Sequence, residues 1–156
     1  IYSHFNGMQG LLDALYIEGF EKVIEAVDVS IDELGLKTAV ILATQNYLMF
    51  AEKYDAHYRL MFGTNNGGYE PSAEARQIGA KCFAKLTKLV SSVLPESASL
   101  AEKQQVAMQV WALTHGYVSL KHHSISEMVD MSNWVENAVD AVLLHFEAIE
   151  RQQQGG

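Results

Sequence analysis

Apolar residues recur every three to four positions along almost the whole chain, and this spacing most constrains the fold. It is the spacing of one buried face of an α-helix, whereas the strict alternation of a half-buried β-strand is scarcely found. Prolines, which end helices, occur only at Pro71 and Pro95. The pattern therefore predicts an all-α domain, a bundle of about six helices.

The expected helices follow the ranges in which this periodicity is sustained. They are 8–27, 30–53 with a kink near Gly35, 56–62, 71–93, 100–120 and 133–151. Two capping boxes, Ser30 with Glu33 and Ser99 with Glu102, mark helix starts, because each pair can satisfy the other's free backbone donors. Pro71 suits the first turn of its helix.

Composition restricts what the domain binds. A chain of 156 residues suits one compact domain, and 49% hydrophobic residues are enough to form a core. The 19 acidic residues outnumber the 11 basic ones, for a net charge of −8. DNA binding depends on clustered Lys and Arg side chains. A small apolar molecule or a protein is therefore the expected direct ligand of this domain.

Cysteine usage and hydropathy indicate the compartment. Cys82 is the one cysteine, so a disulfide framework is excluded and a cytoplasmic location is expected. No apolar run approaches the roughly 20 residues of a membrane span, so no membrane partner is expected. The chain begins with Ile1 rather than Met, which indicates that a natural N-terminal segment is missing.

Three stretches carry a resemblance to a known family. Residues 1–15 contain Tyr-x-His-Phe, then a turn and a Leu-Leu pair; residues 50–62 are rich in aromatic side chains; residues 111–116 run from a Trp to His-Gly. In this order and spacing they resemble the TetR family of transcriptional regulators. The third stretch is similar to the signature of the subgroup with the WHG-type C-terminal domain, named for its Trp…His-Gly motif.

The resemblance implies a domain organisation and a function. Residues 1–5 would end a DNA-binding helix-turn-helix head, 6–151 would form the ligand-binding and dimerisation domain, and 152–156 would be a disordered tail. Members of the family are homodimers, and an effector bound in the body changes the spacing of the heads and releases operator DNA. The chain is therefore expected to be mainly the effector-binding part of a ligand-responsive regulator, most often a repressor.

The same resemblance assigns DNA contacts at the end of the recognition helix. Tyr2 and His4 match positions at which the family touches phosphates or base edges, and Phe5 matches the residue that packs the head on the body. The family often has a Lys three residues after that Phe, where this chain has Met8. The departure weakens the expected phosphate contact at this helix start.

An effector pocket is expected around the aromatic residues of the second and third stretches, and the effector is expected to be small and apolar or aromatic. The predicted lining residues are Tyr47, Phe50, Tyr54, Tyr58, Met61, Phe62, Phe83, Met108, Trp111 and His115. An ordinary hydrophobic core stays open as the alternative, because ligand sites are themselves mostly apolar.

The last two long helices would pair with those of a second subunit. The helix over 133–151 carries two apolar stripes, which is typical of a helix that packs on two neighbours. The stripe of Trp134, Ala138, Ala141 and His145 is predicted to face outward as the dimer interface.

Other function classes receive little support. The chain has neither the Glu-x-x-His of a di-iron bundle nor the Gly-x-Ser-x-Gly of a hydrolase, so no enzyme is expected. The loop 63–68 lacks the Lys of a phosphate-binding loop. Of His122, His123 and Glu127, the adjacent histidines point in different directions on a helix, and the two ligands that remain are too few for a metal site. No cofactor or metal is expected. The alternative function is a stand-alone small-molecule-binding or adaptor dimer without DNA binding, and the segment that precedes Ile1 would distinguish the two.

Overall fold

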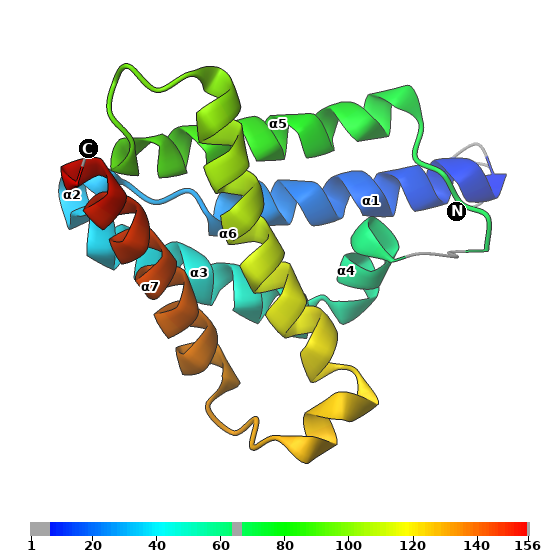
Figure 1. Ribbon diagram of the computed structural model, residues 1–156. Helices are drawn as coiled ribbons and strands as arrows, with labels where there is room; N and C mark the ends of the chain where they lie inside the picture. Colours follow the sequence, from blue (N-terminus) through cyan, green and yellow to red (C-terminus); the bar gives the residue numbers. More distant parts are fainter. Residues whose placement is uncertain (1–6, 64–66, 156) are drawn as a thin grey trace.

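The computed structural model describes residues 7–63 and 67–155, and within them every regular element is helical (Figure 1). The elements are α1 (Gly7–Ala26), α2 (Ile31–Leu34), α3 (Leu36–Lys53), α4 (Asp55–Phe62), α5 (Ala73–Val90), η1 (Ser91–Val93), α6 (Leu100–Lys121), η2 (Ser124–Met128) and α7 (Trp134–Gln154). The all-α prediction is confirmed. The expected helix over 30–53 is divided, so that α2 is a single turn.

Local sequence explains where the helices begin. Gly35 separates α2 from α3 because its φ of +81° is open to glycine at little cost, and the predicted kink is thus a full break. Ser99 and Glu102 form the complete capping box of α6. Ser72 caps α5 by accepting from the Ala75 N–H, so this helix begins after Pro71 rather than at it.

The C-terminal helix is longer than predicted. α7 continues to Gln154, and the Gly155 N–H bonds to the Arg151 carbonyl. Residues 152–154, expected in a disordered tail, are therefore helical, although their side chains are exposed. The polar composition that predicted a tail does not by itself end a helix, because Gln is a good helix former.

Two helix pairs and a central helix organise the packing (Figure 1). α1 lies along α5 and also contacts α4. α6 crosses this pair and packs against α7, while α3 packs against both α6 and α7. Elements from both ends of the chain thus meet around α3 and α6.

The buried side chains form two clusters. The first includes Phe20 of α1, Tyr47 of α3 and Tyr58 of α4. The second joins Val90 of α5, Val110 of α6, and Val142 and Phe146 of α7. Helix α3 supplies both clusters, so its middle turns lie at the boundary between them. None of the described helices is both long enough and apolar enough to cross a membrane.

Candidate functional site

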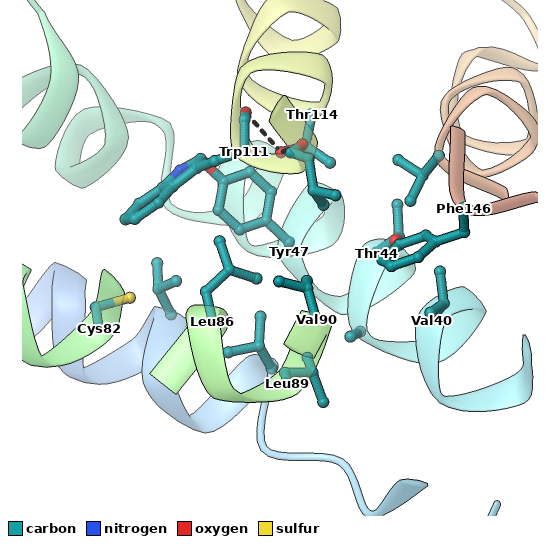
Figure 2. Close-up of a pocket in the computed structure, with 15 residues that line it drawn as sticks. Val40, Thr44, Tyr47, Cys82, Leu86, Leu89, Val90, Trp111, Thr114 and Phe146 are labelled. Atoms are coloured by element: carbon teal, nitrogen blue, oxygen red, sulfur yellow. Dashed lines mark hydrogen bonds between the residues drawn. The ribbon is translucent and has the colours of Figure 1, made fainter. Parts of the chain in front are cut away.

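A cavity lies at the boundary between the two core clusters (Figure 2). Helices α1, α3, α5, α6 and α7 all contribute to its wall, and its volume is about 50 Å³. Its lining residues are Val23, Val27, Val40, Ala43, Thr44, Tyr47, Cys82, Leu86, Leu89, Val90, Val110, Trp111, Thr114, Val142 and Phe146. None of these described residues carries a charge, so the wall is suited to an apolar, uncharged molecule.

One side of the cavity carries a chain of hydrogen bonds. Trp111 Nε1 donates to the Tyr47 hydroxyl at 2.8 Å, and this hydroxyl lies 3.0 Å from that of Tyr58. The Tyr58 hydroxyl in turn lies 2.7 Å from His115 Nδ1. The chain connects a wall of the cavity on α3 and α6 with α4.

Burial keeps the titratable side chains of this hydrogen-bond chain uncharged. It raises the pKa of Tyr47 well above the ordinary value and that of Tyr58 to about 12, so both phenols stay protonated. Burial also lowers the pKa of His115, which favours the neutral imidazole. The direction of the two hydroxyl bonds then depends on which His115 nitrogen carries the proton.

Aromatic rings hold Trp111 in place. Phe83 stacks on it with ring centroids 6.0 Å apart, and Phe62 meets it edge-on at 5.8 Å. Phe62 also packs against Phe20 of α1 at 5.5 Å. The indole is thus packed between rings of α4 and α5, and its neighbours reach as far as α1.

The sequence matches a family model, the tetracyclin repressor-like C-terminal domain, over residues 40–143. The chain belongs to this family. The match contains α4, α5 and α6 and includes most of α3 and most of the cavity lining. The family resemblance of the sequence is confirmed, while the WHG-type subgroup stays a prediction.

A solved structure shares the fold of this tetracycline repressor-like domain. It is described as a protein with unknown function from Rhodococcus sp. RHA1, and it aligns with a TM-score of 0.70 at 21% identity. The alignment covers 96% of this chain and 74% of that one. No curated protein matches the sequence.

The predicted effector residues of the repressor-like domain fall into three groups. Tyr47 and Trp111 line the cavity. Behind this wall lie the hydrogen-bond and ring partners, namely Tyr58, Phe62, Phe83 and His115. The remaining aromatic and Met side chains of α3 and α4, namely Phe50, Tyr54 and Met61, belong to the surrounding core.

The structure corrects the prediction for Met108. This side chain is 54% exposed on α6 and does not reach the cavity. Helix α6 buries the face that carries Val106, Val110 and Thr114, with Trp111 at its edge. Met108 lies beyond that edge, and helical spacing alone does not show where the edge falls.

Most of the cavity wall was not predicted. Most of the missed residues are aliphatic, and in sequence they are indistinguishable from core. Thr44 and Thr114 are exceptions, since each interrupts an apolar stripe, four residues after Val40 and Val110. A lone hydroxyl within such a stripe was the available signal.

The predicted dimer stripe is also corrected. Trp134 and Ala138 are 8% and 0% exposed and pack in the core of their own chain. Ala141 and His145 are only half-buried, and His145 Nε2 bonds to Gln109 of α6 at 2.8 Å. The half of the stripe near Trp134 therefore faces inward, because α7 turns that side toward α3.

The remaining candidates are the predicted DNA contacts, a possible metal site and the thiol of Cys82. Tyr2 and His4, the predicted DNA contacts, lie outside the described residues. The described residues hold no group of three or more His, Cys, Asp or Glu side chains placed to bind a metal. Cys82 lines the cavity, but burial raises the pKa of its thiol to about 12, which keeps it protonated and unreactive.

Proposed function

We propose that this chain is the effector-binding and dimerisation domain of a ligand-responsive transcriptional regulator that acts as a repressor. Membership of the tetracycline repressor-like family supports a regulatory role. The observation that carries the proposal is the uncharged cavity to which five helices contribute, α1 among them. In the family, the helix in the place of α1 follows directly after the DNA-binding head.

The size of the cavity supports a coupling between binding and shape. Ligand sites for drug-sized molecules occupy roughly 300–1,000 Å³, whereas this cavity measures about 50 Å³. An effector of ordinary size therefore has to move the walls apart. Val23 belongs to α1 and Val27 follows directly after its last residue, so displacement of this wall moves the helix next to the head.

Such a movement acts on DNA through geometry. Two heads must meet half-sites about one helical turn apart, roughly 34 Å. An effector that favours a different inclination of α1 lowers the affinity at both half-sites, by an amount limited by its own preference between the two states. Release of DNA on effector binding follows from this coupling, and such release supports repression as the mode of regulation.

The exposed face of α6 and α7 is the proposed homodimer interface. Met108 and Ala112 of α6 and Leu144 of α7 are exposed there, with Ala141 and His145 at the edge. Two such faces together would form a four-helix bundle. The Gln109–His145 bond ties the two helices of one subunit into a single surface.

The chemistry of the wall supports binding rather than turnover. The thiol of Cys82 and the phenol of Tyr47 stay protonated, and the other described lining side chains are aliphatic, aromatic or threonine. General acid–base catalysis needs a group that titrates near the working pH. A bound effector is therefore expected to leave the cavity with its own chemical structure unaltered.

The test is selection from a random double-stranded DNA library with the natural full-length protein that carries this chain. We expect enrichment of a palindrome with half-sites about one helical turn apart. A Met108→Arg variant, made to prevent pairing, serves as the control and should lose the palindrome. If a dimeric wild-type protein enriches no DNA, the regulator proposal fails in favour of a stand-alone small-molecule-binding module.

A further inference from the structure

Three threonines are the buried polar residues of the described chain, and one of them differs from the other two. Thr87 donates its hydroxyl to the Phe83 carbonyl at 2.9 Å, and Thr114 bonds to the Trp111 carbonyl at 3.0 Å. Buried hydroxyls on helices commonly find such a partner one turn back. Thr44, on α3, makes no hydrogen bond within the described residues.

The position of Thr44 explains what its hydroxyl faces. The residue is 6% exposed, and it lines the cavity between Val40 and Tyr47 on the same helix (Figure 2). A hydroxyl that lines a cavity without a partner in the protein is open to a hydrogen bond with a bound molecule.

The other polar groups of the wall have little capacity left. Trp111 Nε1 donates to Tyr47, and the Tyr47 hydroxyl also pairs with Tyr58. The Thr114 proton is directed to backbone carbonyls of its own helix. The Tyr47 hydroxyl can then either accept or donate one further bond, and the Thr114 hydroxyl can only accept. Thr44 alone among these oxygens is therefore free both to donate and to accept.

We propose that Thr44 is the polar anchor of the cavity and that the effector is an uncharged, largely apolar molecule with a single hydroxyl group. The inference rests on the proposed effector site and adds the chemistry of its ligand. A hydroxyl both donates and accepts, so it matches Thr44 in either direction. A carboxylate or ammonium would lose its hydration against a wall without countercharge, which is strongly unfavourable.

The test uses two probes of nearly equal shape, phenol and toluene, which differ by a hydroxyl in place of a methyl. Their dissociation constants are measured by titration calorimetry with the chain of residues 1–156, with Thr44→Val, and with Thr44→Ser. Valine keeps the shape of threonine without the hydroxyl, and serine keeps the hydroxyl. Thermal unfolding of each variant establishes that it is folded.

We expect Thr44→Val to weaken phenol binding by about fivefold, the worth of one net hydrogen bond, and to leave toluene binding unchanged. Thr44→Ser should retain the phenol affinity. An equal effect on both probes, or a loss of phenol binding in Thr44→Ser as large as in Thr44→Val, overturns the anchor role while the cavity stands. Benzoate is expected not to bind, and benzoate affinity equal to that of phenol overturns the uncharged class.

Failure of the underlying site has a different signature. If neither phenol nor toluene binds the wild-type chain at any accessible concentration, the cavity is not a ligand site. Both the effector proposal and the anchor role then fail. If toluene binds and only the dependence on Thr44 is missing, the effector site survives without the anchor.

Discussion

Met61 of α4 lies directly against Gly19 of α1, so closely that a Cβ atom on Gly19 would overlap the Met61 Sδ atom. Both residues are buried. The short helix α4, which carries Tyr58 of the hydrogen-bond chain, is thereby seated on the helix that also lines the cavity. The absence of a side chain at Gly19 sets the separation of α1 and α4.

Replacing this glycine is expected to destabilise the protein. Gly19→Ala should lower the free energy of unfolding by about 1–2 kcal/mol, because overpacking outweighs the gain in helix propensity. Gly79→Ala on α5 is the matched control: its Cβ would meet Phe20 and Tyr16 only at ordinary contact distances, from 3.5 Å. The control should stabilise by roughly 0.5–1 kcal/mol. Urea unfolding of both variants provides the comparison, and equal shifts of the same sign would contradict the close contact.

Removing the Tyr47 hydroxyl is expected to cost more than its size suggests. Tyr47→Phe leaves Trp111 Nε1 and the Tyr58 hydroxyl without their shared partner in a buried site. The expected loss is about 1–3 kcal/mol in the free energy of unfolding, measured in urea. Tyr54→Phe, at the half-buried C-cap residue of α3, removes a hydroxyl for which the structure shows no hydrogen bond within the described chain, and should change stability by less than about 0.5 kcal/mol. Equal losses in the two variants would contradict a cooperative chain.

The stability of the domain is expected to depend on pH through His115. Burial lowers the pKa of this histidine in the folded state below the value of 6.5 that it has when exposed. The unfolded chain then binds more protons in this window, so the free energy of unfolding falls as the pH falls from 6.5 through the folded pKa. His115→Asn supplies a neutral amide near the Tyr58 hydroxyl and should remove this part of the dependence. Urea unfolding between about pH 5 and 8 tests it; an unchanged slope in the variant would assign the dependence to other groups.

Helical spacing was enough to predict the class of fold, because each long helix buries one continuous apolar face. The breaks between helices could be predicted in part, as at Gly35, where only glycine adopts the positive φ angle at little cost. The start of α5 after the Ser72 cap rather than at Pro71 could be predicted only by comparing two competing signals. The end of α7 depends on continued backbone bonding, which composition does not report.

The site was predictable only at aromatic residues that stand out from an aliphatic core. Tyr47 was predicted from an aromatic stripe at helical spacing and Trp111 from the Trp…His-Gly resemblance, and both line the cavity. Aliphatic lining such as Val23 and Phe146 depends on which faces of five helices converge, and periodicity within one helix does not contain that information. The same limit explains why Ala138 was wrongly predicted to lie in the dimer interface. Two apolar stripes on one helix do not reveal which of them faces the chain's own core.

The exposed face of α6 and α7 leads to the last prediction. Met108→Arg places a charge at the centre of the proposed interface and should convert the dimer to a monomer, because an unpaired buried charge is strongly unfavourable. Met49→Arg on α3 is the matched control: Met49 is 63% exposed and lies on another helix, so this variant should remain a dimer. Ala138→Arg, in contrast, should unfold the chain, because Ala138 has no exposed surface. Sedimentation velocity with circular dichroism separates loss of pairing from loss of folding. A Met108→Arg protein that still sediments as a dimer would place the interface on another face.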